Sequence, residues 1–248
     1  MSYYIGTEAY RWRATMMGLL KTLMKFLASS TAQTKPSAVT EPLPDLLSVK
    51  NLRKVMTSKS YIFFDGNKRL NLNIIGVRRD NHGTNEFDDF LVVLYKNQNL
   101  KEECKVYSIT TDPGEHWLKN PLNPKGTAVL VPGQYRGTWK LGRHQNKYEA
   151  LVQAKPVKVW RDNNKDNIID YQGFNTLSEG YFGINIHRSN PYDKSYLVNK
   201  WSAGCQVFQS VKDYDEFLDM CKRSANLYGN SFTYTLLTEQ EIRKHLKS

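Results

Sequence analysis

The middle of this chain is a row of short segments rich in β-branched and aromatic residues, and no other feature limits the possible folds as strongly. Gly, Asn, Asp or Pro separates each segment from the next, as turns between strands require. The predicted strands are 61–65, 70–78, 88–95, 105–110, 127–131, 134–141, 147–153 and 157–161. This pattern predicts a mainly β fold, either a β-sandwich or a barrel.

The C-terminal third continues the pattern and adds helices. Its predicted strands are 183–187, 203–208 and 232–237. Apolar residues recur at helical spacing over 210–227, which predicts one helix there. Thr238 and Glu241 form a capping box, which predicts a short final helix over 239–246. We therefore expect a few peripheral helices around a β core.

The N-terminal 28 residues have the pattern of an amphipathic helix. Apolar residues recur at intervals of three and four between Trp12 and Leu27, which predicts a helix within 1–28. Lys21 and Lys25 interrupt its apolar stretch, so no transmembrane span is expected. Four roles fit such a segment: a cleaved signal, a contact with a partner or a second copy, a membrane-surface helix, or a helix folded back on its own domain.

Ser, Thr, Ala and Pro dominate the segment that follows this helix. Pro36, Pro42 and Pro44 argue against a regular helix or central strand, so residues 29–50 are predicted to be a semi-extended linker. The folded β domain is then expected to occupy residues 51–248.

The chain is basic, with 35 Lys and Arg against 24 Asp and Glu and a formal net charge of +11. A surface of this sign attracts polyanions such as cell-wall polymers, anionic lipids or nucleic acid. The sequence has no Cys/His finger spacing, no RNA-binding aromatic signature and no long basic block. These absences argue against nucleic acid as the partner.

The three cysteines are an odd number without C-x-x-C spacing, which argues against a disulfide framework and against a zinc site. Cys104 and Cys221 are interpreted as inert core residues. Cys205 is different because the small residues Ser202, Ala203 and Gly204 precede it.

A cysteine nucleophile needs a base, close access for the substrate and N–H donors for the oxyanion. The 202–205 segment offers the access, and His187, at the end of a predicted strand, offers the base if the two strands are neighbours. Ser202 either orients this pair through a hydrogen bond or closes a turn. The remaining histidines stand among polar residues and are predicted to be solvated: His82, His116, His144 and His245.

The order of these residues resembles the catalytic motif of the L,D-transpeptidases, in which a strand ending in His-Gly is followed by Ser/Thr-x-Gly-Cys. Upstream, the segment 126–135 looks like the Gly-Thr segment of that family, so the resemblance covers roughly residues 125–210. The sequence of residues 201–206 looks more like versions of the motif in bacteriophage-encoded proteins that act on cell walls than like those in the bacterial cross-linking enzymes.

This resemblance implies a β domain of the L,D-transpeptidase type that acts on peptidoglycan at the bacterial cell envelope, with a virion as one setting. It implies that Cys205 attacks a stem-peptide carbonyl, that His187 takes and returns the proton, and that the Gly204 and Cys205 amides hold the oxyanion. No cofactor is required for this chemistry. The residues leave open whether water or an amine accepts the acyl group.

The chain departs from the family motif at three positions. Arg188 follows the histidine in place of Gly, Ala203 precedes the motif Gly in place of His, and Val207 stands where the family has Arg. A cation for the substrate carboxylate must then come from elsewhere, and Arg188 or Arg78 is the candidate.

A second constellation has the oxygen side chains of a calcium loop. Its residues match the first part of an EF-hand-type loop, with Ile168 ligating through its carbonyl: Asp162, Asn164, Asp166, Ile168 and Asp170. The Gly and the bidentate Glu of such loops are absent. The sequence thus predicts either a structural Ca²⁺ site or an Asp/Asn-rich turn between two strands.

The leading hypothesis is a cysteine-dependent enzyme that hydrolyses or transfers peptidoglycan stem peptides. The alternative is a catalytically silent wall-binding protein, or a structural component of a virion or envelope assembly that associates through the N-terminal helix.

Overall fold

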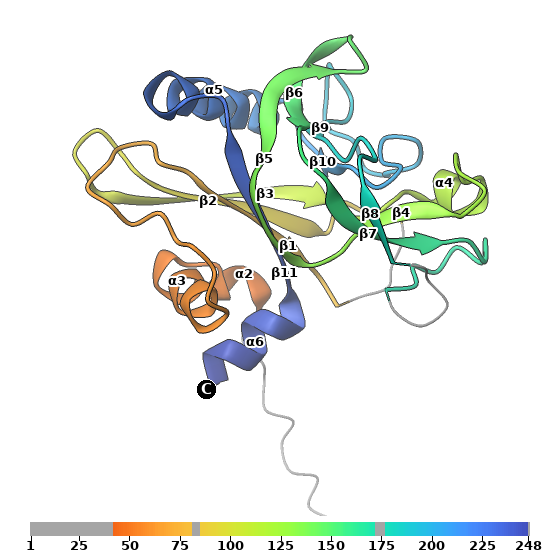
Figure 1. Ribbon diagram of the computed structural model, residues 1–248, viewed down its shortest axis with the longest axis horizontal. Helices are drawn as coiled ribbons and strands as arrows, with labels where there is room; N and C mark the ends of the chain where they lie inside the picture. The colour runs from red at the N-terminus through yellow and green to blue at the C-terminus, as the bar shows by residue number, and fades with distance from the viewer. Residues whose placement is uncertain (1–41, 81–84, 172–176, 248) are drawn as a thin grey trace, which may run out of the picture. The chain divides into compact units, whose positions relative to one another are not determined.

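The computed structural model describes residues 42–80, 85–171 and 177–247 (Figure 1). Most of its strands belong to one sheet: β1 (Asn73–Arg78), β2 (Asp89–Lys96), β3 (Glu102–Thr110), β5 (Gly133–His144), β6 (Tyr148–Gln153), β9 (Ile186–Arg188), β10 (Gln206–Phe208) and β11 (Phe232–Thr238). This sheet closes into a barrel in the order β1-β11-β5-β6-β9-β10-β3-β2. A smaller sheet contains β4 (Thr127–Leu130), β7 (Val157–Asp162) and β8 (Ser178–Gly180). The predicted mainly β fold is confirmed.

Most neighbouring strands of the barrel are antiparallel, but two pairs are parallel. Strand β1 runs parallel to β11, and β9 runs parallel to β10. Parallel neighbours need a long connection, and the connection between β9 and β10 carries residues 189–205. The short β9–β10 pair places the segment with His187 beside the segment that follows Cys205.

The barrel strands bury side chains on both faces. On β1, Ile74 packs in the same core cluster as Trp139 of β5, whereas Ile75 and Val77 pack with the helix α3 (Val49–Ser58). Successive residues of a strand point to opposite faces, which explains this division. The Trp139 indole is fully buried and donates a hydrogen bond of 2.8 Å to the Ile184 carbonyl.

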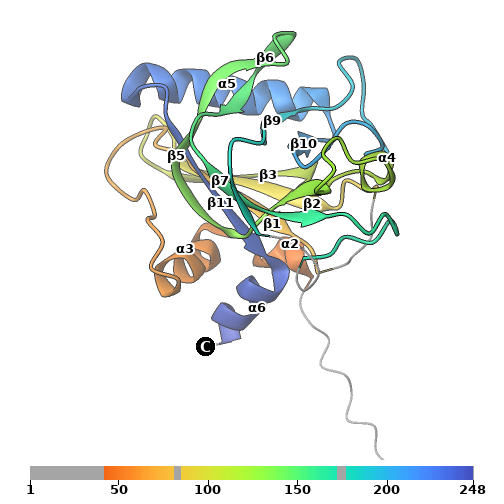
Figure 2. The same cartoon turned by 45° about the vertical axis from the view of Figure 1, so that its right-hand side comes forward.

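Five helices accompany the strands in the described ranges: α2 (Leu43–Leu46), α3, α4 (Glu115–Lys119), α5 (Val211–Tyr228) and α6 (Glu239–Lys247). Figures 1 and 2 show α5 on one side of the barrel and α3 with α6 on the other. Both predicted C-terminal helices are confirmed. The capping box is present, since Glu241 N–H donates to Thr238 Oγ1 and Thr238 N–H donates to Glu241 Oε2. None of the described helices is both long and apolar enough to cross a membrane.

The part of the predicted linker that the structure describes is not semi-extended. Residues 43–46 form α2, α3 begins at Val49, and Leu43 and Leu46 are buried. Pro44 was predicted to argue against a helix here. Proline is tolerated in the first turn of a helix because no N–H donor is needed there, and Pro44 lies in the first turn of α2. The predicted helix within 1–28 and the linker up to residue 41 lie outside the described residues.

The predicted strand 61–65 is not a strand. Side-chain amides take the place of a neighbouring strand: Gln134 bonds both the N–H and the carbonyl of Ile62, each at 2.9 Å, and Asn73 does the same for Phe64, at 2.7 and 3.1 Å. The backbone is satisfied without joining a sheet.

Candidate active site

The parallel pairing of β9 with β10 places His187 and Cys205 on one face. Gln206 is in register with Ile186 and Val207 with His187, and Gln206 N–H donates to the Asn185 carbonyl. Cys205 is therefore opposite Asn185, two residues before the partner of His187. Because alternate residues of a strand share a face, the side chains of Cys205 and His187 project from the same side of the pair.

The turn before Cys205 fits the fold only because residue 204 is glycine. Gly204 has φ +116°, a backbone conformation that residues with a Cβ rarely adopt. A Cβ at this position would also lie 2.2 Å from the Ala128 carbonyl oxygen of β4. Ser202 closes the turn: its hydroxyl donates to the Cys205 carbonyl at 2.8 Å and accepts from Gly204 N–H at 3.2 Å. Of the two roles considered for Ser202, these contacts support the turn.

We expect Gly204→Ala to destabilise the protein by at least about 2 kcal/mol, because it adds backbone strain and a clash with β4. The matched control is Gly183→Ala. Gly183 also has positive φ, +71°, but nothing lies near its missing Cβ, so its loss should be about 1 kcal/mol. Urea unfolding of both variants measures this difference. Equal losses of unfolding free energy would mean that the clash of a Cβ at residue 204 with the Ala128 carbonyl does not affect stability.

The Cys205 thiol is buried but lies at the wall of a cavity. Its exposed fraction is 9%, and the sulfur is within hydrogen-bonding distance of the Gly183 carbonyl, to which the thiol donates at 3.3 Å. The Asn185 N–H donates to the sulfur at 3.5 Å. The cavity has a volume of about 490 Å³, and its walls include Thr127, Ala128, His144, Arg161, Phe182, Gly183, Asn185, Ala203 and Cys205.

Burial raises the pKa of Cys205 to about 11, and the Asn185 amide offsets this only in part. The resting thiol is therefore protonated at neutral pH. We expect the rate of Cys205 alkylation by iodoacetamide to rise about tenfold per pH unit from pH 7 to 10, since only the thiolate reacts. Peptide mass spectrometry measures the rate at this residue alone. In urea the rise should level off near the ordinary thiol pKa of about 8.5. A plateau below pH 8 in the folded protein would instead indicate a thiolate–imidazolium pair at rest.

The hydrogen bonds of His187 fix the position of its proton. Nδ1 lies 2.7 Å from the Arg188 carbonyl oxygen, which can only accept, so Nδ1 carries the hydrogen. The Tyr148 hydroxyl, 3.0 Å from Nδ1, donates to the same carbonyl at 3.2 Å. Nε2 is then the unprotonated nitrogen. It is buried and has no hydrogen-bond partner within the described ranges, so the thiol is not bonded to it at rest.

Burial, and next the neighbouring His144 ring, lower the pKa of His187 to about 3. The imidazole is thus neutral at physiological pH and can accept a proton at Nε2. At rest, Cys205 and His187 are two neutral groups on neighbouring segments, with no hydrogen bond between them. Cys205 lines the cavity, whereas His187 is buried and not among the described lining residues.

His144 is the site residue that sequence reasoning missed, and its predicted solvation is wrong. It is 9% exposed, and its ring stacks on His187 with 4.0 Å between centroids. Asn185 Oδ1 accepts from Gln153 N–H, so the Asn185 amide donates to His144 Nδ1 at 3.0 Å and leaves the proton of the neutral ring on Nε2. His144 supplies a hydrogen-bond donor at the wall of the Cys205 cavity.

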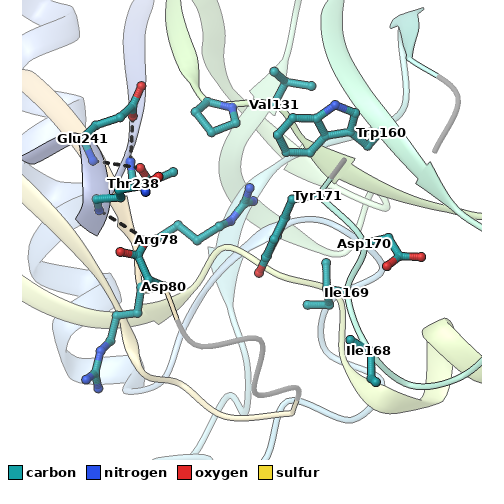
Figure 3. A pocket seen from close by; sticks show the side chains of 13 residues that line it. Arg78, Asp80, Val131, Trp160, Ile168, Ile169, Asp170, Tyr171, Thr238 and Glu241 are labelled. Carbon is teal, nitrogen blue, oxygen red and sulfur yellow. Dashed lines mark hydrogen bonds between the residues drawn. The ribbon is translucent and has the colours of Figure 1, made fainter. Parts of the chain in front are cut away.

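Neither predicted cation lines this cavity. Arg188 lies over the Tyr148 ring, 4.1 Å from its centroid. Arg78 is fully buried and forms an ion pair of 2.9 Å with Asp112. Figure 3 shows Arg78 beside Tyr171 in a second, larger cavity, which also includes Trp160.

The predicted calcium loop is a turn that bonds to itself. Asn164 Nδ2 donates to Asp166 and to Asp170, and Asp170 N–H donates to Asp162. Ile168 N–H donates to Asp166 Oδ1. In the part of the chain that the structure describes, no group of three or more His, Cys, Asp or Glu side chains is placed to hold a metal ion. Calcium binding at this turn stays a prediction.

The resemblance to L,D-transpeptidases rests on the residues around His187 and Cys205. The structure brings these residues to one face of two neighbouring strands. Comparison of the sequence with protein-family models and with curated proteins finds no match.

Proposed function

We propose that this chain is a cysteine-dependent enzyme that acts on peptidoglycan stem peptides, with a barrel of the L,D-transpeptidase type. One observation carries the proposal: the buried, unprotonated Nε2 of His187 has no hydrogen-bond partner among the described residues, although it shares a face with the Cys205 thiol. A buried nitrogen without a hydrogen bond costs stability, so a functional reason is expected for it. Accepting the thiol proton during catalysis is such a reason.

The reaction has two steps. In the first, Cys205 Sγ attacks the carbonyl of a stem-peptide bond while its proton moves to His187 Nε2, and the resulting imidazolium gives that proton to the leaving amine. The C–N bond breaks and a thioester to Cys205 forms. In the second step, water or an acceptor amine attacks the thioester, loses a proton to Nε2, and the thiol is restored. Water gives hydrolysis and an amine gives transpeptidation.

Two hydrogen-bond donors near Cys205 are candidates to stabilise the oxyanion. Gly204 N–H donates to Ser202 Oγ at rest, so it serves the oxyanion only when that hydrogen bond is shared or released. His144 Nε2–H is a further donor at the cavity wall. Hydrogen bonds to the developing oxyanion are among the largest contributions to acyl-transfer catalysis.

The test is mass analysis of purified peptidoglycan after incubation with the wild type and with Cys205→Ala. Shortened stem peptides only with the wild type indicate hydrolysis, and new cross-links or exchanged residues indicate transfer. Unchanged peptidoglycan with both proteins, at concentrations where both bind the wall, contradicts the proposal.

A second candidate function has its own supporting observation. The Cys205 thiol donates to the Gly183 carbonyl and not to His187, and its pKa is raised, so the resting site is not activated. A catalytically silent protein that binds the wall through its basic surface, in a virion or envelope assembly held by the segment 1–28, fits this state. It predicts that Cys205→Ala leaves wall binding and assembly unchanged.

A further inference from the structure

Arg161 is the cation of the cavity that contains Cys205. It lies on β7, in register with Ala128 of β4, and a Cβ at Gly204 would lie 2.2 Å from the Ala128 carbonyl oxygen. The backbone of β4 at Ala128 therefore neighbours both Arg161 and the turn before Cys205. Both line the same cavity.

The Arg161 charge has no carboxylate partner among the described residues. The residue is 9% exposed. One NH donates to the Gly126 carbonyl at 3.1 Å, and the guanidinium lies 4.7 Å from the Phe182 ring centroid. Within the described part of the chain, the buried Nε has no hydrogen-bond partner. Burial lowers the pKa of Arg161, and no anion in that part of the chain opposes this effect. A buried cation without an anion is costly.

The cavity around it favours an anion. None of the described residues that line it is Asp or Glu. The uncharged polar groups there are amides, hydroxyls and the neutral His144, which can donate hydrogen bonds. Arg78, by contrast, is neutralised by Asp112 in the other cavity.

We propose that Arg161 binds a carboxylate of the acyl donor and thereby sets which peptides reach Cys205. This inference rests on the proposed function, and it names the substrate class as peptides with a free carboxylate near the attacked bond. A planar guanidinium matches a carboxylate with two parallel hydrogen bonds, which a lysine does not reproduce.

The experiment measures protection of Cys205 from iodoacetamide at pH 9, followed at this residue by peptide mass spectrometry. The probes are stem tetrapeptides with a free C-terminal carboxylate and the same peptides with all carboxylates amidated. For the wild type, we expect half-protection at a concentration about 10- to 100-fold lower for the free acid, the range for a charge-assisted hydrogen bond. Arg161→Gln should remove this preference, and Arg161→Lys should keep only part of it.

The matched control is Arg223→Gln on α5, an exposed arginine outside the cavity, which should leave the preference unchanged. Thermal unfolding shows that each variant is folded. Equal protection by the acid and the amide in the wild type overturns the inference without any variant, and so does a preference that survives in Arg161→Gln. Protection reports occupancy of the cavity whether or not the peptide is turned over. A preference for the acid with unchanged peptidoglycan would therefore support Arg161 as the anion site and contradict the enzyme.

Discussion

Cys205→Ala is expected to lower the rate of stem-peptide cleavage or transfer by at least about 10⁴-fold, because the variant cannot form the thioester intermediate. Cys205 carries the only thiol among the described residues that line the cavity. The rate is measured as product formed from purified peptidoglycan per unit time.

Cys104→Ala is the matched control for this loss. Cys104 is also a free cysteine, but its sulfur donates to the Leu47 carbonyl at the α3 side of the barrel. Its replacement should change the rate less than about twofold, as expected for a residue remote from the reaction. If Cys205→Ala keeps its activity, Cys205 is not the nucleophile.

His187→Gln is expected to lower kcat/KM by about 10² to 10⁴-fold, the usual contribution of a general base. Glutamine was chosen because its side-chain amide can still donate to the Arg188 carbonyl, as Nδ1 does now. The substitution removes Nε2, the proton acceptor, and keeps a hydrogen bond to the Arg188 carbonyl. Measured rates over pH 5 to 10 give kcat/KM for both proteins.

His144→Gln is the comparison variant, because His144 stacks on His187 but has its Nδ1 occupied by the Asn185 amide. Glutamine keeps an N–H donor for the oxyanion and loses the ring stack, so the loss should be smaller than that of the base, about tenfold. A larger loss of kcat/KM in His144→Gln than in His187→Gln would indicate that His144, and not His187, is the base.

Many strands of the two sheets were predictable because they carry their signal locally. Strands β2, β4, β6 and β7 follow apolar and β-branched runs bounded by turn residues, and their bounds agree with the predicted segments to within a few residues. The predicted strand 61–65 was wrong because side chains bond its backbone in place of a neighbouring strand. No local pattern shows that Gln134 and Asn73 satisfy the backbone of 61–65.

The proximity of His187 to the Cys205 turn was inferred from chemistry, and the parallel pairing of β9 with β10 gives its physical basis. His144 and Arg161 could not be found in the same way. Each reaches the cavity through contacts between distant parts of the chain, His144 through Asn185 and Arg161 through β4. In the sequence both look like ordinary surface residues near turns. Their burial is visible only once the barrel and the small sheet are assembled.

The most direct test of the central claim is intact-protein mass spectrometry of the wild type quenched in acid during reaction with stem peptides. The account predicts a covalent adduct with the mass of the acyl fragment, mapped to Cys205 and absent from Cys205→Ala. His187→Gln should form it more slowly. If products accumulate with no adduct on Cys205 at any time, or if the adduct maps to another residue, the acyl-cysteine mechanism is contradicted.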